Sequence, residues 1–369
     1  MTLIQLELQL IASIVAVACA LPGVFLVLRR MSMLSDAITH TVLLGIVLAF
    51  FLTGDLTSPL LLAGAALMGI FTVLLVELLF KTRLVKEDAA IGLVFPALFS
   101  IAVILISRYS SGVHLDTDAV LMGELAFAPF KRFSPFGFDI GPVSLYLMAG
   151  ILFLNLAFIA LFYKELKLAT FDAGLAASLG FAPGILHYGL MTMVSITAVG
   201  AFETVGSILV VALMVAPPIT AYLLTDNLAR MIGLSALIGV VSAISGYWLA
   251  FLLDASIAGS MATMAGALFG ITFLFAPERG LIAITRRRAR QRWEFAQTML
   301  AIHLFQHEGL PEEKQENSLN HLHEHLRWQP DFAVSVVEQA ERKGLISRIN
   351  GNLVLSERGR DLAQEAIVR

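Results

Sequence analysis

The chain has 369 residues, of which 58% are hydrophobic and only 14% are charged, and its formal net charge is −3. A soluble domain carries about 25% charged residues. The charge is also uneven, since 25 charged residues lie from Arg286 onward and only 28 lie among the first 285 positions. The composition therefore excludes a soluble globular protein over most of the length, and it predicts a membrane domain over residues 1–285 and a separate domain over 286–369.

Nine apolar runs are long enough to cross about 30 Å of hydrocarbon, which takes roughly 20 helical residues. They are Leu10–Leu28, Leu34–Leu52, Pro59–Phe80, Ala89–Ile106, Val143–Phe162, Ile185–Ala201, Val205–Leu224, Ile232–Leu253 and Met261–Phe275. The stretch Ile185–Leu224 could instead be one span with a re-entrant piece, so we expect eight or nine spans. Pro217 and Pro218 should break or kink the span that holds them.

Lys and Arg residues follow every second span. Such residues favour the cytoplasmic side of a membrane, so nine spans with the N-terminus outside fit the pattern best. The protein is then a multi-pass protein of the cell inner (plasma) membrane, and the domain after the last span is cytoplasmic.

Asp36 and His40 give the sharpest polar signal within the predicted spans. They are four residues apart, so on a helix both side chains project from one face. A carboxylate and an imidazole together suit a divalent ion such as Mn²⁺, Fe²⁺ or Zn²⁺. The alternative is that Asp36 caps the start of a helix while His40 packs in a core.

Two further groups of polar residues are candidates for the same chemistry. Glu203 falls between two apolar runs, either at the outer mouth or within a broken helix, where transporters commonly place ligands. His114, Asp116 and Asp118 alternate in the predicted outer loop, where they could be entry ligands or a solvated surface.

The segment Phe171–Phe181 is too short to span a membrane and is weakly amphipathic. It could dock on a cytoplasmic partner or form a surface turn, and the residues we single out in it are Phe171, Asp172, Leu175, Leu179 and Gly180.

After Arg292 the sequence predicts helices over Arg292–His307, Leu319–Arg327 and Pro330–Lys343. A hairpin follows around Asn350-Gly351, a strong turn signal, and then a last helix from Ser356. This order indicates a small α+β winged-helix domain. Paired histidines in it, namely His303 with His307 and His321 with His325, could bind metal and report cytoplasmic levels, or could be a polar helix face. From Glu294 onward there are 8 basic and 12 acidic residues, so we expect no nucleic-acid partner.

The Gly-x-x-x-x-Gly-Lys-Ser/Thr motif that cradles nucleotide phosphates does not occur in the sequence. We therefore expect this chain not to be an enzyme, and any ATP hydrolysis to take place in another subunit.

Several separated motifs resemble the permeases of zinc/manganese/iron ABC importers. The segment Leu28–Gly45, which holds Asp36 and His40, is similar to the signature segment of these permeases. Segments beginning at Glu87, His114 and Val205 are similar to others, so the resemblance covers roughly residues 1–280. From Ala340 onward the tail is similar to the winged helix of metal-dependent repressors of the diphtheria-toxin-repressor type.

The resemblance implies an all-α polytopic membrane protein that carries Mn²⁺, or Zn²⁺ or Fe²⁺, as its substrate, with no permanently bound cofactor. It implies an ATP-binding cassette subunit, an extracytoplasmic metal-binding protein and a second permease copy or paralogue as partners. It also implies that Asp36 and His40 line the metal path and that Phe171–Phe181 docks on the ATPase. A gradient-driven metal transporter and a membrane-tethered metal sensor are the alternatives.

Overall fold

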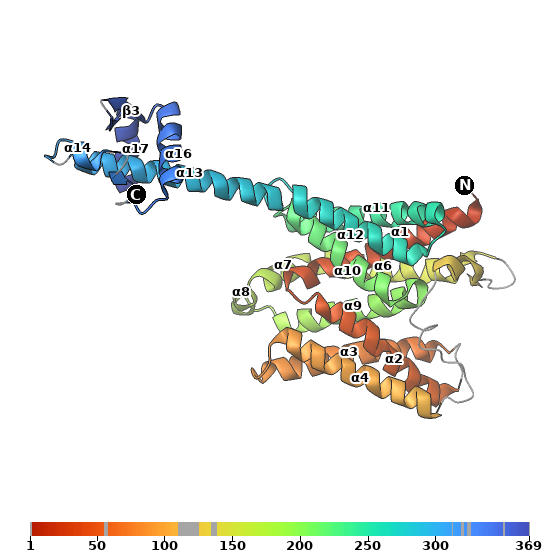
Figure 1. Cartoon of the computed structure of the whole chain (residues 1–369). Helices are drawn as coiled ribbons and strands as arrows, with labels where there is room; N and C mark the ends of the chain where they lie inside the picture. The colour runs from red at the N-terminus through yellow and green to blue at the C-terminus, as the bar shows by residue number, and fades with distance from the viewer. Residues whose placement is uncertain are drawn as a thin grey trace. The chain divides into compact units, whose positions relative to one another are not determined.

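The computed structural model describes residues 2–54, 58–109, 125–133, 139–311, 313–318, 321–322, 326–349 and 351–368. The chain divides into two compact units, Met1–Gly280 and Leu281–Arg369. Figure 1 shows the helices of each unit.

Within the described residues the first unit contains nine helices that are long and apolar enough to cross a membrane. They are α1 (Leu3–Leu28), α2 (Met33–Thr53), α3 (Pro59–Lys81), α4 (Glu87–Tyr109), α6 (Val143–Leu161), α9 (Pro183–Val205), α10 (Ser207–Leu224), α11 (Leu228–Leu253) and α12 (Ile257–Phe275). For this part of the chain the higher of the two expected counts is confirmed. The stretch 185–224 forms two helices, which Gly206 separates at a φ of 81°, a backbone angle that glycine adopts at little cost.

Helix α1 is the centre of this unit. Every residue from Ala18 to Leu26 is buried, and the helix packs against α11, α10, α6 and α9. Gly23 allows the close crossing with α10, because a Cβ at this position would lie 2.1 Å from the carbonyl oxygen of Met214. An alanine at position 23 would therefore push the two helices apart.

Helix α10 holds the two prolines that were expected to break or kink a span, and of these two alternatives the break does not occur. Pro217 and Pro218 both lie within a single continuous helix and are buried. Proline removes a backbone donor, but neighbouring helices can stabilise the freed carbonyl groups of a membrane helix, and the span is not broken.

Polar contacts also join the helices of the first unit. The Asn155 amide on α6 donates to the Ala18 carbonyl oxygen at 3.1 Å and to Thr197 Oγ1 on α9 at 2.8 Å. Thr72 on α3 donates to Thr41 on α2 at 2.8 Å. Such interhelical bonds each contribute about 0.6–1.7 kcal/mol within a bilayer, and they fix the register of the helices that carry the candidate site.

Large apolar side chains are exposed on the outer faces of several helices. Examples are Leu67 on α3, Phe153 on α6 and Leu252 on α11. A helix can leave such residues unburied when its surroundings are lipid, since lipid tails are as apolar as leucine.

Short elements connect the long helices. They are the 3-10 helix η1 (Leu125–Phe130), strands β1 (Arg132–Phe133) and β2 (Gly141–Pro142), and helices α7 (Tyr163–Phe171) and α8 (Ala173–Ser178). The two strands pair antiparallel, with Arg132 opposite Pro142.

The second unit contains α13 (Leu281–His307), α14 (Glu313–Glu316), α16 (Pro330–Arg342), β3 (Ile346–Ile349), β4 (Asn352–Leu355) and α17 (Glu357–Val368). The helix expected to begin at Arg292 begins at Leu281 instead. Most of the helix expected over 319–327 lies outside the described residues. Strands β3 and β4 form the hairpin around Asn350-Gly351, with Ile346 opposite Leu355.

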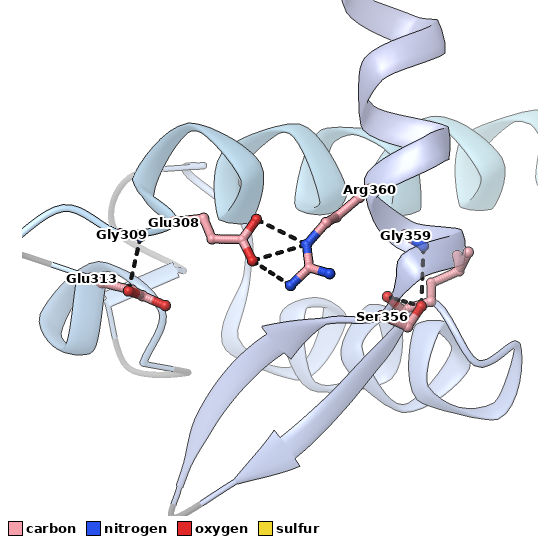
Figure 2. A network of polar contacts seen from close by, with 7 residues as sticks. Glu308, Gly309, Glu313, Ser356, Gly359 and Arg360 are labelled. Atoms are coloured by element: carbon pink, nitrogen blue, oxygen red, sulfur yellow. Dashed lines mark hydrogen bonds and ion pairs between the residues drawn. The ribbon is translucent and has the colours of Figure 1, made fainter.

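An apolar core and one ion pair hold the second unit together. The core gathers Leu300 and Leu304 of α13, Val336 and Val337 of α16, and Leu353 of β4. Figure 2 shows the Arg360 guanidinium of α17 facing the Glu308 carboxylate, with nitrogen–oxygen distances of 2.6–3.1 Å. The last helix is thus joined to the end of α13 by charge as well as by packing.

Candidate metal path

Asp36 and His40 lie on one face of α2, as their spacing predicts. The Oδ1 atom of Asp36 is 3.4 Å from Nε2 of His40. Atoms that bind one ion at about 2.1 Å lie about 3.0–3.4 Å apart at octahedral or tetrahedral angles. The pair can therefore hold one divalent ion between its two side chains.

Asp36 is not the residue that caps the helix. Ser32 is the N-cap of α2, and Asp36 follows one turn later. Asp36 therefore lies near the N-terminal end of α2, with its side chain free of a capping role.

Helix α4 forms one wall beside His40. The imidazole stacks on Phe95, with ring centroids 5.7 Å apart, and meets the edge of Phe99 at 6.0 Å. The side chains of Asp36 and His40 nevertheless stay 36% and 31% exposed. His40 thus packs against α4 on one side, while another side of the Asp36–His40 pair remains exposed.

The packing of α2 against α3 explains this orientation. A Cβ on Gly45 would lie 2.4 Å from the carbonyl oxygen of Gly64, and Thr41 contacts Thr72. Gly45 and Thr41 therefore fix the α2 face that turns to α3. Successive residues differ by about 100° around a helix, so His40 points to a different side from its neighbour Thr41.

Glu203 lies far from this pair. Its carboxylate is exposed and forms an ion pair with Lys131 at 2.8 Å. Thr41 of α2 contacts Thr72 of α3, and Ser195 of α9 contacts Ala66 of α3. Both α2 and α9 run antiparallel to α3, so these contacts fix the position of each helix along the bundle. With a helical rise of 1.5 Å per residue, Glu203 lies roughly 20 Å along the bundle from His40. The structure does not bring Glu203 to the Asp36–His40 pair.

The expected entry ligands His114, Asp116 and Asp118 lie outside the described residues. The structure gives no position for them.

The expected docking segment is a turn of helix that exposes apolar side chains. Asp172 caps α8 by accepting a hydrogen bond from the Leu175 amide at 2.9 Å, and Gly180 ends the turn at a φ of 85°. Phe171, Leu175 and Leu179 are all exposed. Exposed apolar side chains gathered between two helices indicate a binding surface.

The sequence reasoning missed a polar cluster at the same end of the bundle as this segment. Nε2 of His187 on α9 lies 2.9 Å from Oε1 of Glu77 on α3, and Nδ1 of His187 lies 3.2 Å from Nη1 of Arg29. Because arginine only donates, Nδ1 of His187 accepts from Arg29. Tyr188 also donates to Glu77, and Arg29 Nε donates to Thr170 of α7 at 3.2 Å.

Through this cluster α3, α7 and α9 are connected to the end of α1, just before the turn that leads into α2. Lys81, four positions away, lies 3.4 Å from Glu77, but the two partners on α9, His187 and Tyr188, are more than 100 positions away in the sequence, so the cluster could not be predicted from spacing.

In the second unit the structure brings three of the four predicted histidines close to one acid, Glu316. His303 and His307 face each other with ring centroids 4.7 Å apart, and His321 Nε2 is 3.3 Å from Glu316 Oε1. His325 lies outside the described residues.

Comparison with known proteins adds independent observations. The model of the ABC 3 transport family matches residues 4–276. The zinc transport system membrane protein TroD of Treponema pallidum (strain Nichols) is 50% identical over 359 residues, which is 97% of this chain and 98% of that protein. The manganese transport system membrane protein MntD of Bacillus subtilis (strain 168) is 48% identical over 283 residues, which is 77% of this chain and 96% of that protein.

Solved structures share the fold. The structure described as PsaBC from Streptococcus pneumoniae in complex with Fab matches with a TM-score of 0.64 and 26% identity, covering 77% of this chain and 96% of that one. An inward-facing conformation of a metal-chelate type ABC transporter matches with a TM-score of 0.55 and 20% identity, covering 72% of this chain and 84% of that one. This second likeness concerns the fold alone.

Proposed function

Because the chain belongs to the ABC 3 transport family, we propose that it is the membrane-spanning subunit of an ATP-driven importer of Mn²⁺, with Zn²⁺ and Fe²⁺ as the other candidate substrates. The observation that carries the metal assignment is the Asp36–His40 pair with its donor atoms 3.4 Å apart. The names of the zinc and manganese relatives support the same class of substrate.

The chemistry of the pair favours a transition metal over Mg²⁺ or Ca²⁺. An imidazole nitrogen suits Zn²⁺, Fe²⁺ and Mn²⁺, whereas Mg²⁺ and Ca²⁺ prefer oxygen ligands alone. Two protein ligands per chain also hold an ion weakly enough to release it, as a transport path requires. The ion is the substrate here and not a resident cofactor.

The exposure of the pair supports a second permease in the complex. A charged side chain facing lipid costs on the order of 3 kcal/mol or more, so the open side of Asp36 and His40 should meet either another protein or a wet passage. A second permease copy or paralogue placed against this face would cover the pair with protein and enclose a wet passage. It would also bring a second metal-binding pair to the same path.

The exposed segment 171–181 supports docking on an ATP-binding cassette subunit. Phe171, Leu175 and Leu179 would insert into the partner, and Asp172 and Gly180 would shape the turn that presents them. The Glu77–His187–Arg29 cluster would then transmit movement of α7 and α9 to the start of α2, where Asp36 lies. An extracytoplasmic metal-binding protein would deliver the ion at the opposite end of the bundle, where Glu203 lies.

We infer a winged-helix arrangement for the second unit from its helix α16, hairpin and helix α17. The excess of acidic residues from Glu294 onward argues against a nucleic-acid partner. The arginines that begin α13 favour a cytoplasmic position for this unit in the plasma membrane protein.

Reconstitution in liposomes tests the proposal against its rivals. We expect the permease, together with its ATPase and binding protein, to take up Mn²⁺ only when ATP is present, and competition with Zn²⁺ and Fe²⁺ to rank the substrates. Equal uptake without ATP would favour a gradient-driven transporter. If the assembled complex moved none of the three ions, the tethered sensor would be favoured and the proposal would fail.

A further inference from the structure

Three potential metal ligands meet in the second unit, outside the residues matched by the family model. One ligand atom from each of His303, His307 and Glu316 lies within 4.8 Å of the other two. His303 and His307 are one turn apart on α13, so their imidazoles project from the same face. Glu316 comes from the end of α14, which lies beside that face.

A fourth donor lies next to this group. Oε1 of Glu316 is 3.3 Å from Nε2 of His321, while Oε2 of Glu316 is 4.0 Å from Nε2 of His303. The carboxylate thus lies between two imidazoles that come from different segments. The side chain of His321 is 24% exposed, so solvent can reach the group from this side.

Burial makes the group different from a solvated polar surface. The side chains of Glu316 and His303 are only 11% and 8% exposed. Nδ1 of His307 is buried as well, and no hydrogen-bond partner for it lies in the part of the chain that the structure describes. Imidazole and carboxylate donors gathered in this way out of water can share one divalent cation.

We propose that His303, His307 and Glu316, with His321 as a fourth ligand, form a binding site for one divalent transition-metal ion. Imidazole nitrogens with a single carboxylate suit Zn²⁺ and the neighbouring borderline ions better than Mg²⁺ or Ca²⁺. Ligands of a tetrahedral ion lie about 3.4 Å apart, so donor atoms now up to 4.8 Å apart must approach one another by up to about 1.4 Å.

Closing around an ion would change the local structure in a defined way. His303 Nε2 lies 3.3 Å from the carbonyl oxygen of Glu316, so binding of the ion through Nε2 would break this contact, whereas binding through Nδ1 would keep it. The ion would then link α13 directly to the segment that contains α14 and His321. A site of this kind allows the second unit to respond to the ions that the first unit is proposed to import.

Metal content of the full chain tests the site. The chain carrying Asp36→Ala and His40→Ala removes the proposed transport pair and leaves the second unit unaltered. After incubation with Zn²⁺ and dialysis of the detergent-solubilised protein, we expect one ion to remain per chain. Retention of no ion by this variant would overturn the site, whatever the outcome of the transport experiments.

Substitutions in the second unit locate the ion. Adding His307→Ala and Glu316→Gln to the same background should remove the remaining Zn²⁺, while Glu338→Gln, which alters an exposed acid on α16, should leave it bound. If the His307→Ala/Glu316→Gln chain kept its ion, the assignment of these ligands would be wrong. A poorly folded substituted chain would also lose Zn²⁺, so the existence of the site is decided by the parent variant, whose second unit is unaltered, and the substituted chain is compared only if its thermal midpoint matches that of the parent.

Discussion

Truncation of Leu179 to alanine is expected to weaken binding of the ATPase subunit about five- to thirty-fold. Leu179 lies at the end of the α8 turn and is 61% exposed. Full burial of a leucine side chain contributes about 1.5–3 kcal/mol, so covering the exposed part should contribute about 1–2 kcal/mol. Each 1.4 kcal/mol changes a dissociation constant tenfold, which gives the stated range.

The measurement is the affinity of the purified ATPase subunit for the full chain in lipid nanodiscs, by biolayer interferometry. Leu84→Ala is the matched control, because Leu84 is 87% exposed in the turn between α3 and α4 but lies outside the docking segment. Unchanged affinity for Leu179→Ala, or an equal loss for Leu84→Ala, would refute the docking assignment.

Three further outcomes are expected. Asn155→Leu removes two interhelical hydrogen bonds and should lower the thermal midpoint of the detergent-solubilised permease, with a loss of about 0.6–1.7 kcal/mol per bond; an unchanged midpoint would show that α1, α6 and α9 do not depend on them. Glu77→Gln should reduce metal uptake per ATP hydrolysed without reducing ATPase binding, and normal coupling would exclude the cluster from transmission. The hydrogen bonds from Arg360 hold the pKa of Glu308 below its usual value of 4.5, so the stabilisation by this pair is complete above that value and is lost as the pH falls through the lower folded-state pKa. The thermal midpoint of the second unit should therefore exceed that of Glu308→Gln at pH 7 and converge with it at low pH, and a pH-independent difference would contradict this.

The spans could be predicted from the sequence because each is a continuous apolar run of the length that a bilayer requires. The proximity of Asp36 and His40 could be predicted because the two residues lie one turn apart on one helix, so their spacing in the sequence determines their spacing in the structure. The exposed apolar side chains of 171–181 could also be predicted, because they lie close together in one short segment of the sequence.

Other features depend on contacts between distant segments, which spacing cannot reveal. Glu77 meets His187 across two helices, and Glu316 reaches His303 from another segment, so neither acid stood out along the chain. The start of α13 was placed too late, because its first turns carry four arginines and show no apolar periodicity. Of the break or kink expected at Pro217 and Pro218, the break does not occur, because neighbouring helices can stabilise the carbonyl groups that proline leaves free in a membrane helix.

Metal uptake by substituted permeases tests the central claim most directly. In liposomes that contain the permease, its ATPase and its binding protein, Asp36→Ala and His40→Ala should each abolish ATP-dependent uptake of Mn²⁺ while the complex still assembles. Asp254→Asn, which alters an exposed acid at the left-handed end of α11, should transport normally because asparagine tolerates that backbone conformation. Uptake at the unaltered rate by both alanine variants would contradict the assignment of the ion path.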